Sequence, residues 1–213
     1  MKIVLVAFAF LLPLGVYAQG SKYDSQKELR GSGRIVRETK TIDPFDGIEI
    51  NQFPAKVTVE VGTAESSVDI SVDDNLRPLL RIDNKAGTLT LAFKDPQDKP
   101  FWISKSTINV IIRTSKLKRL TNGWSNSAIL VKGVSGELFS LVNKANADIT
   151  LRGKVDTFDL VSSANGTINA DGLIVNTANV VTQANATVRI NARTVNEVKS
   201  GQANLVNIAT RPK

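Results

Sequence analysis

The chain has 213 residues, a formal net charge of +7 at pH 7, and neither His nor Cys. The missing His and Cys exclude Ser-His-Asp and Cys-His nucleophiles, disulfide bonds and the usual zinc and copper sites. The length is sufficient for one domain with a sizeable core, and the positive charge favours anionic partners such as acidic glycans or lipids.

Residues 1–18 are predicted to be a signal peptide. The apolar run from Ile3 to Val16 is too short to span a bilayer, but it has the length of a signal-peptide core. Cleavage is expected between Ala18 and Gln19, because small residues precede that bond. No Cys lies near the cut and no later segment is apolar enough to cross a membrane, so we expect an exported product without a transmembrane segment.

Residues 19–40 are polar and mix basic with acidic side chains, which is typical of a flexible leader that becomes ordered near Arg34. The remaining residues, 41–213, show no compositional boundary and are predicted to form one all-β domain. Its first half contains runs of alternating apolar and polar residues that indicate strands, at 45–50, 55–61, 68–72, 88–91 and 107–112.

From about residue 117 onward, one unit of about twenty residues is repeated. The Ala-Asn pairs that mark it, 19 or 20 residues apart, are Ala145-Asn146, Ala164-Asn165, Ala184-Asn185 and Ala203-Asn204. The spacing does not fit leucine-rich repeats, and helix formers never accumulate. A single-stranded parallel β-helix is therefore predicted, with turns of about twenty residues here and wider, irregular turns in the first half.

Stacked turns would align equivalent residues in columns about 4.8 Å apart. Ile149, Ile168 and Val188 would point inward over one another, and Asp171 would lie one rung from Arg152 on the outside. The Asn beside each repeated Ala would form a structural ladder at a tight corner, because Asn tolerates left-handed backbone and bonds locally. Those residues are Asn146, Asn165, Asn185 and Asn204; their use as glycan ligands is the alternative.

Two groups of residues are candidates for ligand binding. The densest basic run contains Arg113, Lys116, Lys118 and Arg119 and could contact phosphates or acidic glycans. No aromatic interleaving or nucleic-acid motif accompanies it, so nucleic acid is not an expected partner. Trp102 and Trp124 could stack on sugar rings, although the pattern favours packing over the core.

No catalytic or metal-binding constellation can be assigned, and no cofactor is expected. β-helix enzymes that act on polysaccharides need neighbouring acids, but the acids of the regular half are scattered and no facing pair can be placed. A lyase or hydrolase stays the enzyme alternative. The segments Asp73-Asp74-Asn75 and Asp95-x-x-Asp98 offer oxygen ligands for calcium, but turn formation is the favoured interpretation.

The order of several motifs resembles a known family. Phe45-x-x-Ile48-x-Ile50, Val57-Thr-Val59, Gly87-Thr-Leu89-Thr-Leu91 and Leu117-x-x-Leu120 precede the Ala-Asn repeats, as in the "putative auto-transporter adhesin, head GIN domain" family. The resemblance covers roughly residues 40–208. It implies a right-handed β-helix, export by Bacteroidetes-like Gram-negative bacteria to the periplasm or cell surface, a role in adhesion, and no catalytic signature.

The predicted function is thus an exported, non-enzymatic, adhesin-like module that contacts glycan or another component of the cell envelope. The alternatives are a polysaccharide-acting β-helix enzyme and a structural solenoid that self-assembles into homo-oligomers, since solenoid ends expose strand edges.

Overall fold

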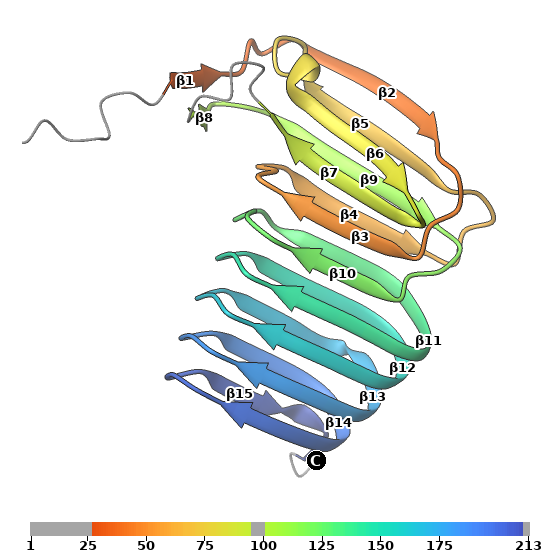
Figure 1. Cartoon of the computed structure of the whole chain (residues 1–213), viewed down its shortest axis with the longest axis vertical. Coiled ribbons are helices and arrows are strands. Elements are labelled where there is room, and N and C mark those ends of the chain that lie inside the picture. The colour runs from red at the N-terminus through yellow and green to blue at the C-terminus, as the bar shows by residue number, and fades with distance from the viewer. Residues whose placement is uncertain (1–26, 95–100, 211–213) are drawn as a thin grey trace, which may run out of the picture.

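The computed structural model describes residues 27–94 and 101–210 and confirms the all-β class (Figure 1). The predicted signal peptide, with its cleavage between Ala18 and Gln19, lies outside the described residues. The strands are β1 Lys27–Arg30, β2 Ile35–Thr41, β3 Gly47–Asn51, β4 Lys56–Val61, β5 Ser67–Asp73, β6 Leu80–Lys85, β7 Thr88–Phe93, β8 Phe101–Ser104, β9 Ile108–Thr114, β10 Arg119–Asn122, β11 Ile129–Asn143, β12 Asp148–Ser162, β13 Thr167–Thr182, β14 Thr187–Lys199 and β15 Asn204–Asn207, with 3-10 turns η1 Arg77–Leu79 and η2 Ile208–Thr210.

The later half is a coil of parallel strands. From β10 to β15, each strand pairs in parallel with the one that follows it. The long strands bend around one side of the coil, so that each of them contributes to both walls (Figure 1). In β11, for example, Val131 pairs with β4 on one wall, whereas Leu141 pairs with β10 on the other.

A glycine marks this bend. Gly153 of β12 has a φ of 148°, and a Cβ there would lie 2.0 Å from the backbone oxygen of Val134 in the preceding turn. A side chain at this position would therefore push adjacent turns apart.

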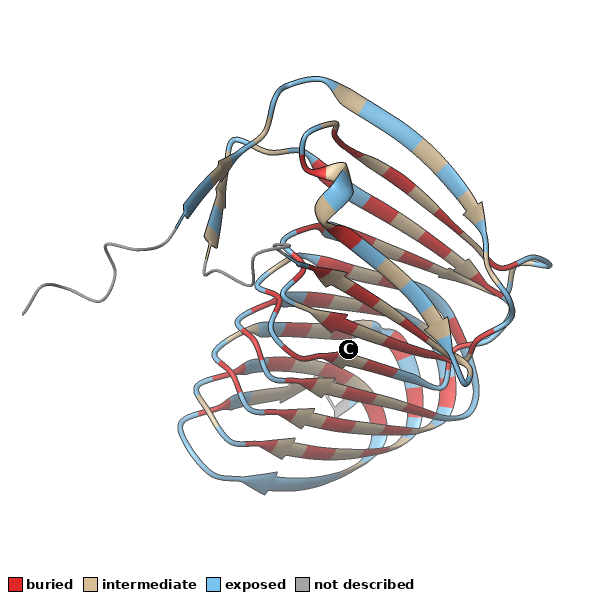
Figure 2. Cartoon of the chain, turned by 45° about the horizontal axis from the view of Figure 1, so that its top comes forward, coloured by how far each residue is buried: buried red, intermediate tan, exposed pale blue. Residues whose placement is uncertain are grey.

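Inward-facing residues form continuous columns between the two walls, visible as the alternating buried bands of Figure 2. The predicted inward column of Ile149, Ile168 and Val188 is confirmed, because these residues pair in register and are buried. The column extends through the first half as well; its other members are Ile70, Val110, Val57, Ile129 and the half-buried Leu205. Each buried aliphatic side chain contributes about 1.5–3 kcal/mol to folding.

The first half is a mixed sheet, so the prediction of one continuous parallel β-helix over residues 41–213 is wrong there. β2 pairs with β5, β5 with β9, and β6 with β7, all antiparallel. The cause is visible between β6 and β7: only Ala86 and Gly87 separate them, both with positive φ. A two-residue turn of this kind can join only antiparallel neighbours. The right-handed winding that the family resemblance implies stays a prediction.

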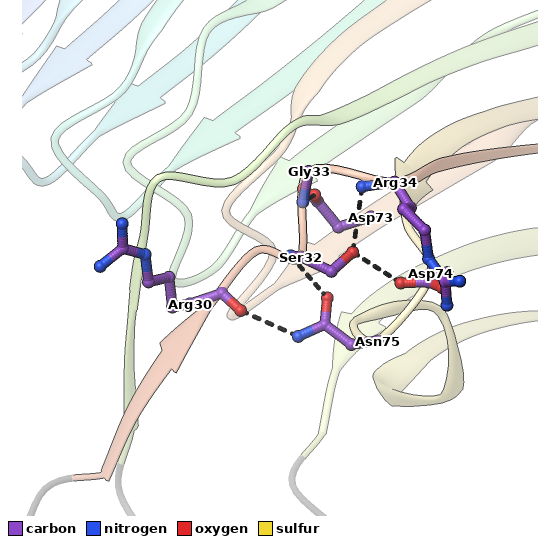
Figure 3. Close-up of polar contacts among 7 residues, drawn as sticks. All are labelled: Arg30, Ser32, Gly33, Arg34, Asp73, Asp74 and Asn75. Carbon is purple, nitrogen blue, oxygen red and sulfur yellow. Dashed lines mark hydrogen bonds and ion pairs between the residues drawn. The ribbon is translucent and has the colours of Figure 1, made fainter.

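The structure describes residues 27–40 of the predicted flexible leader (residues 19–40), and this part contains β1 and most of β2. β1 pairs with β8 in a separate two-stranded sheet, and β2 adds to the edge of β5. Between β1 and β2 the chain is held against the turn after β5 (Figure 3). There the buried carboxylate of Asp73 accepts hydrogen bonds from the backbone N–H groups of Gly33, at 2.6 Å, and Thr107, at 2.7 Å. These contacts order the chain before the position that the sequence suggests.

Charged residues occupy inward register positions at both ends of the stack. At the first end, Glu38 and Lys40 of β2 lie opposite the buried Ile70 and Val68, and Arg77 binds Glu38 at 2.6 Å. At the other end, Glu197 continues the column that contains Leu160 and Val180, and Lys199 continues the one that contains Ser162 and Thr182. Such inward charges discourage further strands from adding to an exposed edge.

We predict that Glu197→Leu combined with Lys199→Thr causes self-association, because the last rung would then resemble the buried rungs that precede it. Sedimentation velocity should show a mass that rises with concentration. Glu137→Leu with Lys154→Thr, which changes exposed charges away from the end, is the matched control. A double variant that sediments like the unmodified protein at every concentration would contradict this role for the charges.

Candidate binding surface

The loops that follow β10 to β14 lie along one edge of the coil (left in Figure 1) and carry a ladder of Asn side chains. Each side-chain oxygen accepts the backbone N–H of the equivalent residue one turn later. Asn146 Oδ1 binds the N–H of Asn165 at 2.9 Å, and Asn165 Oδ1 binds that of Asn185 at 3.0 Å. Asn126 begins the ladder by accepting from Asn146 at 3.1 Å. Asn126 lies 20 residues before Asn146, but Ser125 replaces the Ala that marks the other repeats, so the sequence pattern missed it.

Asn204 is not in the ladder, contrary to the prediction. Its place is taken by Gln202, whose N–H donates to Asn185 Oδ1 at 3.3 Å. The pairing of β13 with β14 shifts between Ala170 and Ile174, so the last turn is three residues shorter than the others. The repeated Ala-Asn pair therefore slips relative to the corner, and Asn204 pairs with Thr187 instead.

The edge retains free hydrogen-bond donors. The Nδ2 groups of the four ladder residues, Asn126, Asn146, Asn165 and Asn185, donate to no other residue in the described ranges, and all four residues are exposed. We call this row, together with Trp124 beside its first member, the amide edge. Successive amides are one strand spacing apart, about 4.8 Å.

The two tryptophans lie on different elements. Trp124 is 76% exposed in the loop between β10 and β11, so it does not cover the core. Trp102 is 49% exposed and lies on β8, opposite Glu28 of β1, in the small separate sheet. Only Trp124 therefore belongs to the amide edge.

The basic run lies around the loop from β9 to β10, at the start of β10, whereas Trp124 follows the end of that strand. The structure thus does not bring the bases and Trp124 together. Lys118 forms an ion pair with Asp46 at 3.0 Å, and Arg119 donates to Thr88 Oγ1 at 2.6 Å. Lys116 is exposed and has no side-chain partner in the described ranges.

Arg113 is part of a charge ladder that crosses five strands. Its guanidinium binds Asp69 of β5 at 2.6 Å and Glu60 of β4 at 3.2 Å. Thr39 of β2 donates to Asp69, and Lys132 of β11 lies 3.9 Å from Glu60. Arg113 lowers the pKa of Asp69 from its ordinary value, with help from the Thr39 hydroxyl, and Asp69 raises the pKa of Arg113 in return. Arg113 is therefore engaged in holding strands together.

Several acids of the regular half are also paired with the next turn. Asp159 accepts from Asn179, and Asn179 accepts from Asn196, which gives a second ladder on the outer face. Asp171 binds Arg189 at 2.8 Å, not Arg152 as predicted, because β12 and β13 shift register after Thr150 and Arg152 then pairs with Gly172. These carboxylates do not form the facing pair that a glycosidase requires.

The oxygen atoms of Asp73-Asp74-Asn75 hold the preceding chain segment (Figure 3). Ser32 Oγ donates to Asp74 at 2.6 Å and lowers its pKa, with further help from an ion pair to Arg34. Ser32 N–H donates to Asn75 Oδ1 at 3.0 Å. These bonds support the turn interpretation over a calcium loop. The described ranges contain no group of three or more acids that could hold a metal ion; Asp95 and Asp98 lie outside them.

Comparison with known proteins gives one family and several similar folds. The model of the family described as "putative auto-transporter adhesin, head GIN domain" matches residues 44–208. A "putative adhesin" from Bacteroides fragilis superposes with a TM-score of 0.61 at 13% identity, over 84% of this chain and 100% of that one. A "putative lipid binding protein" from Parabacteroides distasonis gives 0.52 at 12% identity, over 85% and 100%. At these identities the likeness concerns the fold alone.

No curated protein matches the chain. Within the described part of the chain, the structure contains no helix that is long and apolar enough to span a membrane.

We predict that Asn165→Ala lowers the free energy of unfolding by about 1 kcal/mol, because the N–H of Asn185 loses its acceptor. Asn204→Ala should change it by less than about 0.5 kcal/mol, as expected for an exposed residue outside the ladder. Urea denaturation of both variants measures the difference. If both variants lose the same free energy of unfolding, Asn204 belongs to the ladder, as the sequence repeat predicts, and the alignment seen in the structure is wrong.

Asp69→Asn should reduce stability by up to about 1 kcal/mol, the usual range for a partly exposed ion pair. Because the pKa of Asp69 is lowered in the folded state, the pair stabilises above the unfolded pKa of about 3.9. Its contribution is lost as the pH falls through the lowered value. Unfolding measured from pH 7 to pH 2 should show the difference shrinking below about pH 4, whereas Asp83→Asn, an exposed control, should show no such change. A difference that persists at pH 2 would refute the pairing.

Proposed function

Since this chain belongs to the family described as "putative auto-transporter adhesin, head GIN domain", whose model matches residues 44–208, we propose that it is an exported, non-enzymatic module that binds a glycan of the cell envelope. The family supports an adhesin-like role at the surface or in the envelope. Export rests on the predicted signal peptide, and the glycan rests on the chemistry of the amide edge.

The observation that carries the proposal is the exposure of Trp124 in the loop that also holds Asn126, the first member of a row of free amide donors. An indole ring offers a flat apolar face that the axial C–H groups of a sugar can cover, with an N–H at its edge. Primary amides donate to hydroxyl and ring oxygens. The donors repeat at about 4.8 Å, which is comparable to the length of one pyranose unit, so an extended saccharide could meet one amide per sugar.

The pairing of the acids supports a binding role over catalysis. Asp159 and Asp171 are engaged by neighbouring Asn and Arg side chains. The charged residues at both ends of the stack likewise disfavour the self-assembling alternative.

Trp124→Ala should weaken binding to a responsive glycan about tenfold or more, because a large exposed aromatic surface is lost from the contact. A glycan array followed by isothermal titration calorimetry measures this effect. Trp102→Ala, on the separate β1–β8 sheet, is the control and should leave the affinity unchanged.

If only Trp102→Ala abolished binding, the glycan would contact β8 and not the amide edge. Failure of the unmodified protein to bind any envelope glycan would reject the proposed function.

A further inference from the structure

A groove of about 370 Å³ lies on the β2–β5–β9 sheet and is lined by residues that do not belong to the amide edge. Its lining includes Arg37, Thr39, Ser71, Asn109 and Ile111. It also includes two acids, Glu38 and Asp69, which are bound by Arg77 and Arg113. Ile111 is partly exposed and supplies an apolar patch between the polar side chains.

The register of the strands places four hydrogen-bond donors in one row across this face. Arg37 of β2 pairs with Ser71 of β5, Ser71 pairs with Asn109 of β9, and Asn109 pairs with Lys56 of β4. Residues paired in this way point to the same face of a sheet. The row therefore has a cation at each end, separated by three strand spacings or about 14 Å, with a hydroxyl and an amide between them. Arg37, Ser71 and Asn109 line the groove, and Lys56 extends the row beyond it onto β4.

None of these four side chains has a hydrogen-bond or ion-pair partner in the described ranges. Three of them are exposed, and Ser71 is half-buried. This sets the row apart from Arg113, Lys118 and Arg119, which are engaged by neighbouring side chains. The adjacent row does contain an acid, Asp69, but Arg113 binds it at 2.6 Å and compensates its charge.

We propose that this row binds an acidic polysaccharide, with Arg37 and Lys56 contacting carboxylates of two sugar units. A guanidinium binds a carboxylate through two parallel hydrogen bonds, and an ammonium binds it as a point charge. Ser71 and Asn109 can bond sugar hydroxyl groups, and Ile111 can underlie a ring. The neutral polar groups between the cations favour a saccharide over a bare phosphate chain. The proposal rests on the proposed function for the choice of a glycan, but it uses a different surface.

The test compares polygalacturonate with the same polymer after methyl esterification, which removes its charge and keeps its backbone. Binding of polygalacturonate should fall at least about tenfold in the double variant Arg37→Gln and Lys56→Gln, because the charged hydrogen bonds to two carboxylates are lost. Arg193→Gln with Lys154→Gln lowers the net charge equally at exposed residues on other strands and should have little effect. The unmodified protein should bind the methyl ester far less tightly.

Equal losses in the two double variants would show that net charge alone attracts the polymer, and would overturn the site. If binding of inorganic polyphosphate falls by the same factor in the Arg37→Gln and Lys56→Gln variant, the assignment of a saccharide is overturned. Trp124→Ala tests the amide edge separately. If the Arg37→Gln and Lys56→Gln variant keeps its binding while Trp124→Ala loses glycan binding, the row is wrong and the amide edge stands. The reverse result would mean that the amide edge is wrong and the row stands.

Discussion

The whole structure depends on the vertical register of its inward-facing side chains. One column runs from Ile70 through Ile149 to Leu205 with an aliphatic residue at every rung. A slip of one residue between neighbouring strands would turn the whole apolar set outward. Each buried member contributes about 1.5–3 kcal/mol, against about 1 kcal/mol for a corner hydrogen bond. The columns therefore determine the register, and the Asn ladder follows it.

That register also determines which surface groups are free to bind a ligand. In a stack of this kind, an outward side chain has equivalent positions directly above and below it, and many polar residues use them. Asp159 with Asn179 and Arg113 with Asp69 are pairs of this type. Polar groups that lack such partners within the described residues are the candidates for ligand binding, and they include the amide donors of the corner and the row from Arg37 to Lys56.

The sequence was most informative where the fold is periodic. The repeated Ala-Asn pairs and the Ile149 column follow from a fixed period, because each turn meets the same environment. The antiparallel strands could not be predicted from alternation alone, since either pairing direction gives a period of two. The partner of Asn185 could not be predicted either, because the register shift between β13 and β14 that shortens the last turn by three residues leaves no signal in the sequence. The sequence suggested that Arg113 was unpaired, because its partners Asp69 and Glu60 are far from it in sequence.

The shortened last turn has a consequence for how the molecule opens. β15 covers only Thr187 to Ile190 of β14, and the side chain of Asn207 bonds the backbone of Ala192 on both its N–H and its C=O. From Arg193 to Lys199, β14 is hydrogen-bonded along one edge only, within the residues described. Turns that contact only their neighbours come apart sequentially from the weaker end. Amide hydrogens should therefore exchange fastest in this final segment, and fraying should spread backward turn by turn toward the β2–β5 end.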